Sequence, residues 1–182
     1  MTTEILHIDS SIFGEHGVSS QLSKTLVEQL SQAEQTNVTY HDFAKTEVPH
    51  FTQATIAAIS EGKAELANKF IAEIKAADII VLGVPMYNFG IPSSLKAWFD
   101  HIARAGVTFQ YGENGPEGLL TGKKVYVVAT RGGYHRDQPT DVETPYLNIM
   151  LGFLGLHDVT YVFAEGLNLG DDKRGQAIEG AQ

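Results

Sequence analysis

Two continuous apolar segments constrain the fold of this chain more than any other feature. Positions 79–84 read Ile-Ile-Val-Leu-Gly-Val, and positions 125–129 read Val-Tyr-Val-Val-Ala. Apolar runs of strand length are typical of parallel strands whose two faces are both buried. In open α/β sheets, ligands bind beyond the carboxyl ends of such strands. The loops that follow these two segments are therefore the first places to look for a binding site.

Helical and extended patterns alternate along the rest of the chain. Strands are expected at 5–8, 38–43, 79–84, 124–129 and 159–163, with 38–43 at a sheet edge. Helices are expected at 18–33, 52–76 with a break near Gly62, 92–102 and 140–155, and the tail after Gly170 is polar and weakly helical. The glycine-rich segment 106–122 is expected to be irregular.

This alternation predicts one α/β domain over 1–182. The expected architecture is a flavodoxin-like three-layer sandwich around a five-stranded parallel sheet of order 2-1-3-4-5. The rival Rossmann fold requires a Gly-x-Gly fingerprint, and no two glycines of this chain have that spacing. The Walker A pattern is absent as well.

Composition excludes several classes of function. The chain has 182 residues, no cysteine and a formal net charge of −9. Without cysteine there is no disulfide, thiolate metal site or cysteine nucleophile, which fits a reducing cytoplasm. No basic stripe is visible, which argues against nucleic-acid binding. The amino-terminal segment lacks signal-peptide features and no apolar run has the length of a membrane span, so a cytoplasmic protein with no membrane partner is expected. The histidines show no ligand spacing, so no metal is expected.

Three loops are expected to meet at one crevice, because strands one, three and four are neighbours in the predicted order. The first loop, 9–20, contains four serines and leads into a helix, whose amino terminus can bind an anion. No lysine or arginine precedes Lys24, so backbone and hydroxyl groups, not a cation, are expected to bind a phosphate there. Ordinary helix capping by serine is the alternative explanation.

The other two loops offer groups for a flat ring with polar edges, such as a flavin. Tyr87 and Phe89 could pack against the ring while Asn88 binds its edge; alternatively, the two aromatic side chains close the core over the sheet. Gly132 and Gly133 permit close backbone approach, or simply form a turn. Three basic side chains in or near this loop could attract an anion or form a solvated rim, with Arg131 at the surface: Arg131, His135 and Arg136.

The chain closely resembles the FMN-dependent NADH-azoreductases, which also act as NADH:quinone oxidoreductases. The stretches that carry the resemblance are Pro-Met-Tyr-Asn-Phe at 85–89, Ala-Arg-Ala-Gly-Val-Thr-Phe at 103–109, Glu-Asn-Gly-Pro-Glu-Gly-Leu at 113–119, Thr-Gly-Lys-Lys at 121–124, Arg-Gly-Gly at 131–133, Pro-Thr-Asp at 139–141, Thr-Pro-Tyr-Leu at 144–147, Leu-Gly-Phe at 151–153 and Val-Phe-Ala-Glu-Gly at 162–166. Together they extend over nearly the whole chain.

The resemblance implies a role for each loop. It assigns the FMN phosphate to Ser11, Gly17, Val18 and Ser19. It assigns the isoalloxazine ring to Met86, Tyr87, Asn88 and Phe89, and the pyrimidine end of that ring to Thr130, Arg131, Gly132 and Gly133. It also implies a homodimer with one FMN per subunit, in which Tyr111 and Phe153 shape a substrate pocket at the subunit interface.

The chain departs from the family pattern at several positions. Gly17 and Val18 stand where serine and glutamine are usual, and Thr130 replaces a serine but keeps a hydroxyl. The segment 51–62 is shorter than is usual, and so is the carboxyl-terminal helix after Asp171. The first two substitutions leave phosphate binding there to backbone N–H groups.

The implied activity is reduction of quinones by two electrons, and reductive cleavage of azo compounds, with NADH or NADPH as donor. The cofactor supplies the hydride chemistry. One stacking site used in turn by the nicotinamide and the acceptor gives a ping-pong cycle with no protein residue as an obligatory acid. His135 could donate a proton or bind the substrate; a surface histidine is the alternative. A flavodoxin-type electron carrier and a non-enzymatic FMN-binding module are the rival functions.

Overall fold

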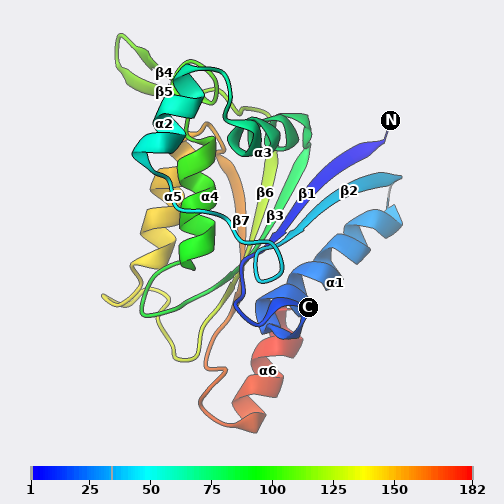
Figure 1. Ribbon diagram of the computed structural model, residues 1–182. Helices are drawn as coiled ribbons and strands as arrows, with labels where there is room; N and C mark the ends of the chain where they lie inside the picture. Colours follow the sequence, from blue (N-terminus) through cyan, green and yellow to red (C-terminus); the bar gives the residue numbers. More distant parts are fainter. Residues whose placement is uncertain (1, 34, 182) are drawn as a thin grey trace.

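A five-stranded parallel sheet forms the centre of the molecule, with helices on both faces (Figure 1). The computed structural model describes residues 2–33 and 35–181. The strand order is β2-β1-β3-β6-β7, which confirms the predicted flavodoxin-like order because β6 and β7 are the fourth and fifth strands of this sheet. These strands are β1 (Thr3–Asp9), β2 (Thr36–Asp42), β3 (Ile79–Pro85), β6 (Lys124–Thr130) and β7 (Asp158–Ala164).

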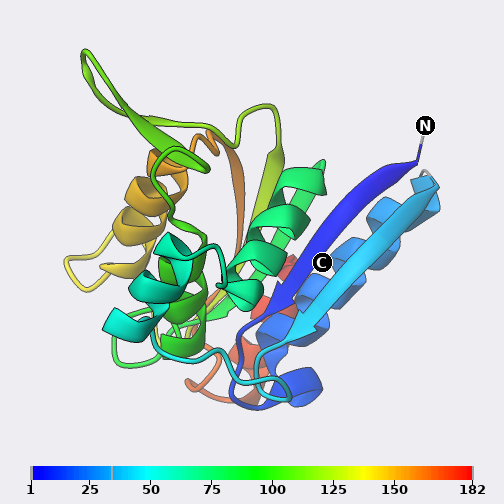
Figure 2. The ribbon, with the colours of Figure 1, turned by 45° about the horizontal axis from the view of Figure 1, so that its top comes forward.

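Two groups of helices cover the sheet. One face carries α1 (Val18–Ala33) and the carboxyl-terminal helix α6 (Asp171–Ala181), which share an apolar cluster with β6 and β7. The other face carries α3 (Glu65–Ala76), α4 (Ser93–Ile102) and α5 (Glu143–Phe153), with α2 (Gln53–Ser60) beside them in Figure 2. The three layers follow from the two-faced burial of the central strands.

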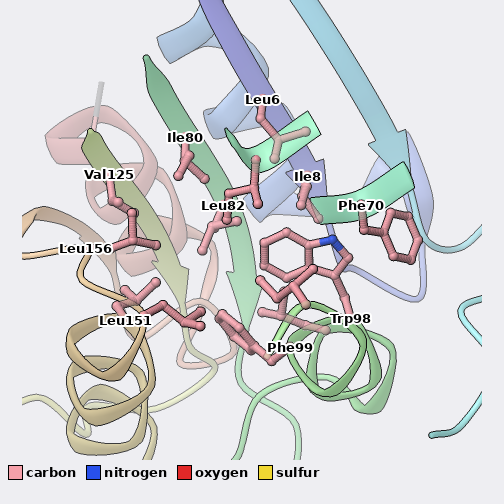
Figure 3. Close-up of a cluster of buried hydrophobic side chains, with 14 of the residues drawn as sticks. Leu6, Ile8, Phe70, Ile80, Leu82, Trp98, Phe99, Val125, Leu151 and Leu156 are labelled. Atoms are coloured by element: carbon pink, nitrogen blue, oxygen red, sulfur yellow. The ribbon is translucent and has the colours of Figure 1, made fainter. Parts of the chain in front are cut away.

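Strand β3 shows why its sequence is continuously apolar. Ile80 and Leu82 belong to the large core cluster on the α3–α4–α5 face, where they lie near Trp98 and Phe99 (Figure 3). Val81 points to the opposite face, where it packs with side chains of α1. Each of these strand residues is fully buried. Alternate side chains therefore enter two different cores, so both faces of the strand must be apolar.

The segment expected to be irregular contains a hairpin. Strands β4 (Phe109–Gly112) and β5 (Gly115–Gly118) pair antiparallel and form a separate two-stranded sheet. The strands are short and rich in glycine and polar residues, so they lack the apolar alternation that marks a strand in a sequence. In Figure 1 this hairpin projects at the opposite end of the molecule from the loops that follow β3 and β6.

The helix predictions hold with small shifts. The break predicted near Gly62 is present, because α2 ends at Ser60 and Gly62 adopts a left-handed φ of 71°. Helix α5 begins at Glu143 and not near Thr140, which places Pro145 in its first turn. A missing N–H has no intrahelical partner to lose there. No helix among the described residues is long and apolar enough to span a membrane.

Candidate functional site

The loops after β1, β3 and β6 meet in one cleft at the carboxyl ends of the strands. Asp9 at the end of β1 pairs with Gly83 of β3, and Pro85 at the end of β3 pairs with Thr130 at the end of β6. The Met86 N–H donates to the Thr130 carbonyl at 2.9 Å, which joins the second loop to the third. The cleft, of about 210 Å³, is lined by Ser11, Phe13, His16, Gly17, Val18, Ser19, Pro85, Met86, Tyr87, Thr130, Arg131, Gly132, Leu167, Asn168 and Arg174. The structure thus brings together nine of the residues predicted from the sequence.

Ser11 and Gly17 fit against each other in the first loop. A Cβ atom at position 17 would lie 2.7 Å from the Ser11 Cβ and closer still to its hydroxyl. The Ser11 hydroxyl accepts a hydrogen bond from the Phe13 N–H at 3.2 Å and lies 3.3 Å from the Tyr87 hydroxyl. Gly17 is therefore the residue that lets the Ser11 side chain occupy this corner of the cleft.

Ser19 lies in the first turn of α1 with its hydroxyl unpartnered. Its side chain is 1 % exposed and lines the cleft, yet its Oγ has no hydrogen-bond partner among the described residues. Buried hydroxyls are normally hydrogen-bonded, because leaving one unpaired costs about 1–3 kcal/mol. The first N–H groups of a helix also lack intrahelical partners. This end of the cleft is therefore a set of donors suited to an anion.

The second loop holds its side chains in a strained turn. Asn88 and Phe89 both have left-handed backbones, with φ of 50° and 67°, and Tyr87 and Gly90 exchange two backbone hydrogen bonds around them. Two consecutive positive φ values are those of a type I′ turn, which favours glycine or asparagine. Phe89 is 52 % exposed, so it does not close the core as the alternative reading held. Neither Asn88 nor Phe89 lines the cleft itself; both lie just beyond Tyr87, which does.

Arg131 in the third loop is buried, contrary to the alternative that placed it at the surface. It is 1 % exposed, and its guanidinium contacts Asp141 at 2.9 Å, Glu165 at 3.2 Å and Glu143 at 3.3 Å. Its positive charge is therefore paired with acidic side chains inside the protein. The Glu165 oxygen that contacts Arg131 also accepts the N–H groups of His135 and Arg136, each at 2.8 Å, so Arg131 and the segment after the two glycines share one carboxylate.

The carboxylates around Arg131 titrate differently. Burial raises the pKa of the Glu143 carboxyl from 4.5 to about 8, although Arg131 opposes the shift. Burial also acts on Asp141, but hydrogen bonds from Arg131 and Thr144 outweigh it and hold the pKa of Asp141 below its usual value. The same surroundings therefore shift the pKa values of two neighbouring carboxyl groups in opposite directions, because burial dominates at Glu143 and hydrogen bonds dominate at Asp141.

Residues near the carboxyl terminus complete the cleft, and they were not predicted from the sequence. The N–H groups of Gly166 and Asn168 donate to the carbonyls of Gly133 and Gly132, each at 3.0 Å. A Cβ atom on Gly132 would collide with the Asn168 side chain, so that glycine permits close packing. This attachment brings Leu167, Asn168 and Arg174 to the cleft. Only their position in the fold, not any spacing in the sequence, places them there.

Comparison with known proteins assigns the chain to a family. The model of a family described as having a flavodoxin-like fold matches residues 3–182. The chain belongs to this flavodoxin-like family.

Individual relatives agree with this assignment and with the resemblance noted above. A protein of Saccharophagus degradans named FMN-dependent NADH:quinone oxidoreductase is 56% identical, over 100% of this chain and 94% of the relative. A protein of the same name from Cellvibrio japonicus is 49% identical, over 98% and 94%. The crystal structure of an azoreductase from Bacillus anthracis superposes with a TM-score of 0.88 and 28% identity, over 99% and 95%.

In this flavodoxin-like chain the cleft lies at the β1/β3 boundary, where the order of the strands reverses. That boundary is where proteins of this fold bind their ligands. Among residues 2–33 and 35–181, no group of three or more acidic or histidine side chains is arranged to hold a metal ion. The groups that line the cleft include hydroxyls, backbone amides, aromatic rings and two arginines, Arg131 and Arg174.

The three residues expected in a substrate pocket fall in two places. The His135 ring packs edge-on against Phe89, 5.8 Å between centroids, and its Nδ1 lies 2.9 Å from the Thr140 hydroxyl. Tyr111, in the hairpin, is 76 % exposed, and Phe109 packs against both Tyr111 and Phe153. Neither Tyr111 nor Phe153 lines the cleft within one copy of the chain.

Proposed function

We propose that this chain is an FMN-dependent oxidoreductase that transfers electrons from NADH or NADPH to quinones and cleaves azo compounds reductively. The relatives named FMN-dependent NADH:quinone oxidoreductase and the azoreductase neighbour support this activity. The observation that carries it in this chain is the unpartnered, buried Ser19 hydroxyl at the anion-binding end of the cleft. Buried hydroxyls normally have a hydrogen-bond partner, and a bound phosphate would supply one for Ser19.

The residues that line the cleft suit the phosphate of FMN and the near edge of its ring. Ser11, Ser19 and the backbone N–H groups of Gly17 and Val18 would hold the phosphate. Met86 and Tyr87 would border the ring, with Thr130–Gly133 backbone groups at its pyrimidine end. A cleft of about 210 Å³ is smaller than the roughly 300–1,000 Å³ of typical ligand pockets, so the ring would extend past it toward Asn88 and Phe89.

FMN, when bound, supplies hydride transfer chemistry that no side chain of this cleft can perform. The chain's own task is to hold the ring edge with fixed backbone groups while one face stays open to a donor and then to an acceptor. Reacting atoms must come within roughly 3–3.5 Å of each other, which demands a rigid frame. The type I′ turn at Asn88 and the Glu165-anchored third loop provide that frame. Sequential use of one open face is the basis for proposing ping-pong kinetics.

A second copy of the chain would complete the substrate pocket. Tyr111 and Phe153 lie away from the cleft within one copy, so a homodimer is required if they are to shape the pocket. Exposed apolar side chains of the hairpin and of α5 and its start support an interface there: Tyr111 at 76 %, Ile149 at 73 % and Val142 at 57 %. The proposed unit is therefore a dimer of single flavodoxin-like domains over 1–182, with one FMN per copy.

Steady-state kinetics test this proposal. The FMN-loaded chain is assayed with NADH and 1,4-benzoquinone, each varied at several fixed concentrations of the other. Parallel double-reciprocal lines are expected for one face used in turn, and intersecting lines would contradict the ping-pong scheme. Absence of both NADH and NADPH oxidation would contradict the enzyme and favour a flavodoxin-type electron carrier.

A further inference from the structure

Arg174 is a basic residue of the cleft that neither the loop sequences nor the family resemblance pointed to. It lies in α6, more than 150 positions after Gly17, Val18 and Ser19, yet it lines the same cleft as these three residues. Its side chain belongs to an exposed stretch of the helix, so the guanidinium remains in contact with solvent. The cleft therefore has a cation beside its hydroxyl and amide donors.

The docking of α6 fixes where Arg174 points. Ala177, Ile178 and Ala181 of α6 pack against a cluster that includes Leu22 of α1. Residues three and four positions apart share one face of a helix, so Arg174 lies on the face that bears Ala177 and Ile178. Figure 1 shows α6 beside the amino-terminal end of α1. The face of α6 that packs its apolar residues against the protein therefore also places Arg174 near the first turn of α1.

The charge of Arg174 is unmatched, unlike that of Arg131. Arg131 shares the cleft but contacts three carboxylates. Within residues 2–33 and 35–181, Arg174 has no ion pair in the structure. A free guanidinium that lines the same cleft as the unpartnered Ser19 hydroxyl is suited to a phosphate, which guanidinium binds through charge-assisted hydrogen bonds.

We infer that Arg174 binds the phosphate of FMN and supplies the positive charge that the first loop lacks. The inference rests on the proposed FMN-dependent function and assigns the carboxyl-terminal helix a part in selecting the cofactor. It resolves a conflict in the charges, because a chain of net charge −9 must bind a dianion. It also predicts that the chain distinguishes FMN from riboflavin, which lacks the phosphate, largely through α6.

The test measures flavin affinity and does not depend on turnover. The full chain, freed of flavin, is titrated with FMN and with riboflavin while flavin fluorescence is followed. Arg174→Gln is expected to weaken FMN binding about tenfold, with riboflavin affinity unchanged, and Arg174→Lys should restore part of the loss. Lys173→Gln removes the same charge from the neighbouring position, outside the cleft lining, and should leave both affinities near wild type. The FMN affinity of the wild type should fall with added salt more steeply than that of Arg174→Gln.

The outcomes separate this inference from the function on which it rests. If wild type binds FMN tightly and Arg174→Gln keeps the same FMN-to-riboflavin ratio, the role of Arg174 is refuted while the proposed function stands. An equal loss in Lys173→Gln would likewise refute it, because the effect would then be one of net charge. If wild type binds no FMN, the proposed function itself fails. Circular dichroism confirms that each variant is folded.

Discussion

At the scale of single residues, the Ser11 hydroxyl can face the cleft because Gly17 has no side chain. Gly17 has an ordinary backbone, with φ of −68° and ψ of 140°, so its glycine is not needed for conformation. It is needed for space, since a Cβ would press on the Ser11 side chain. The two residues are best regarded as one unit, in which a missing methyl group allows a hydroxyl to face the cleft.

Replacing Gly17 by alanine should therefore weaken FMN binding without unfolding the chain. The new methyl group must displace Ser11, and we expect a loss of about tenfold in FMN affinity, or roughly 1.4 kcal/mol. Gly175→Ala is the matched control, because a Cβ at that position meets no atom within 4 Å. It lies inside α6, where alanine is favoured over glycine by about 1 kcal/mol. Equal FMN affinities in the two variants, from fluorescence titration, would show that the Ser11 contact is unimportant.

At the scale of elements, Arg131 joins three segments behind the third loop. Its carboxylate partners come from the start of α5, the loop before it and the residue after β7. Removing one partner of a buried ion pair leaves an uncompensated charge and costs about 3–5 kcal/mol. The cluster therefore stabilises the frame on which Gly132 and Gly133 approach the ligand.

Substituting Arg131 by methionine should lower the free energy of unfolding by about 3–5 kcal/mol. Arg136→Met is the control, since Arg136 also stacks on Phe163, 4.8 Å from its centroid against 5.0 Å for Arg131. Among the residues that the structure describes, its one ion pair is with the exposed Asp137, and such surface pairs contribute less than about 1 kcal/mol. Urea unfolding measures the free energy of unfolding of both variants. Similar losses in the two would mean that the stacking on Phe163, and not the carboxylate cluster, stabilises the loop.

The same cluster predicts how stability depends on pH. Because the folded-state pKa of Glu143 is raised to about 8, the folded chain retains a proton that the unfolded chain releases near its ordinary value of 4.5. This contribution to stability is complete below pH 4.5 and is lost as the pH rises toward 8. Glu143→Gln mimics the protonated acid, so it should lose less stability than wild type between pH 5 and pH 8, by up to about 4 kcal/mol. Parallel curves of unfolding free energy against pH would contradict the raised pKa.

At the scale of the whole molecule, sheet order and the three-loop cleft could be predicted because they depend on local patterns. The apolar run that contains Ile80 and Leu82 predicts a buried strand. The absence of Gly-x-Gly spacing argues against the Rossmann fold. The burial of Arg131 and the place of Arg174 could not be predicted, since each depends on segments that only folding brings together. The β4–β5 hairpin was missed because its glycine and polar residues carry no strand pattern. Local sequence patterns therefore predict the sheet and its loops, whereas the positions of Arg131 and Arg174 depend on contacts between segments that are distant in the sequence.

One anaerobic titration tests most directly whether the FMN-loaded chain is an oxidoreductase that works in two separate half-reactions. The FMN-loaded chain is followed by visible absorbance while NADH is added, and then a quinone. We expect the oxidised flavin spectrum to bleach with one equivalent of NADH per subunit and to return fully with one equivalent of quinone. A flavin spectrum that neither NADH nor NADPH changes would contradict the account and favour an electron carrier.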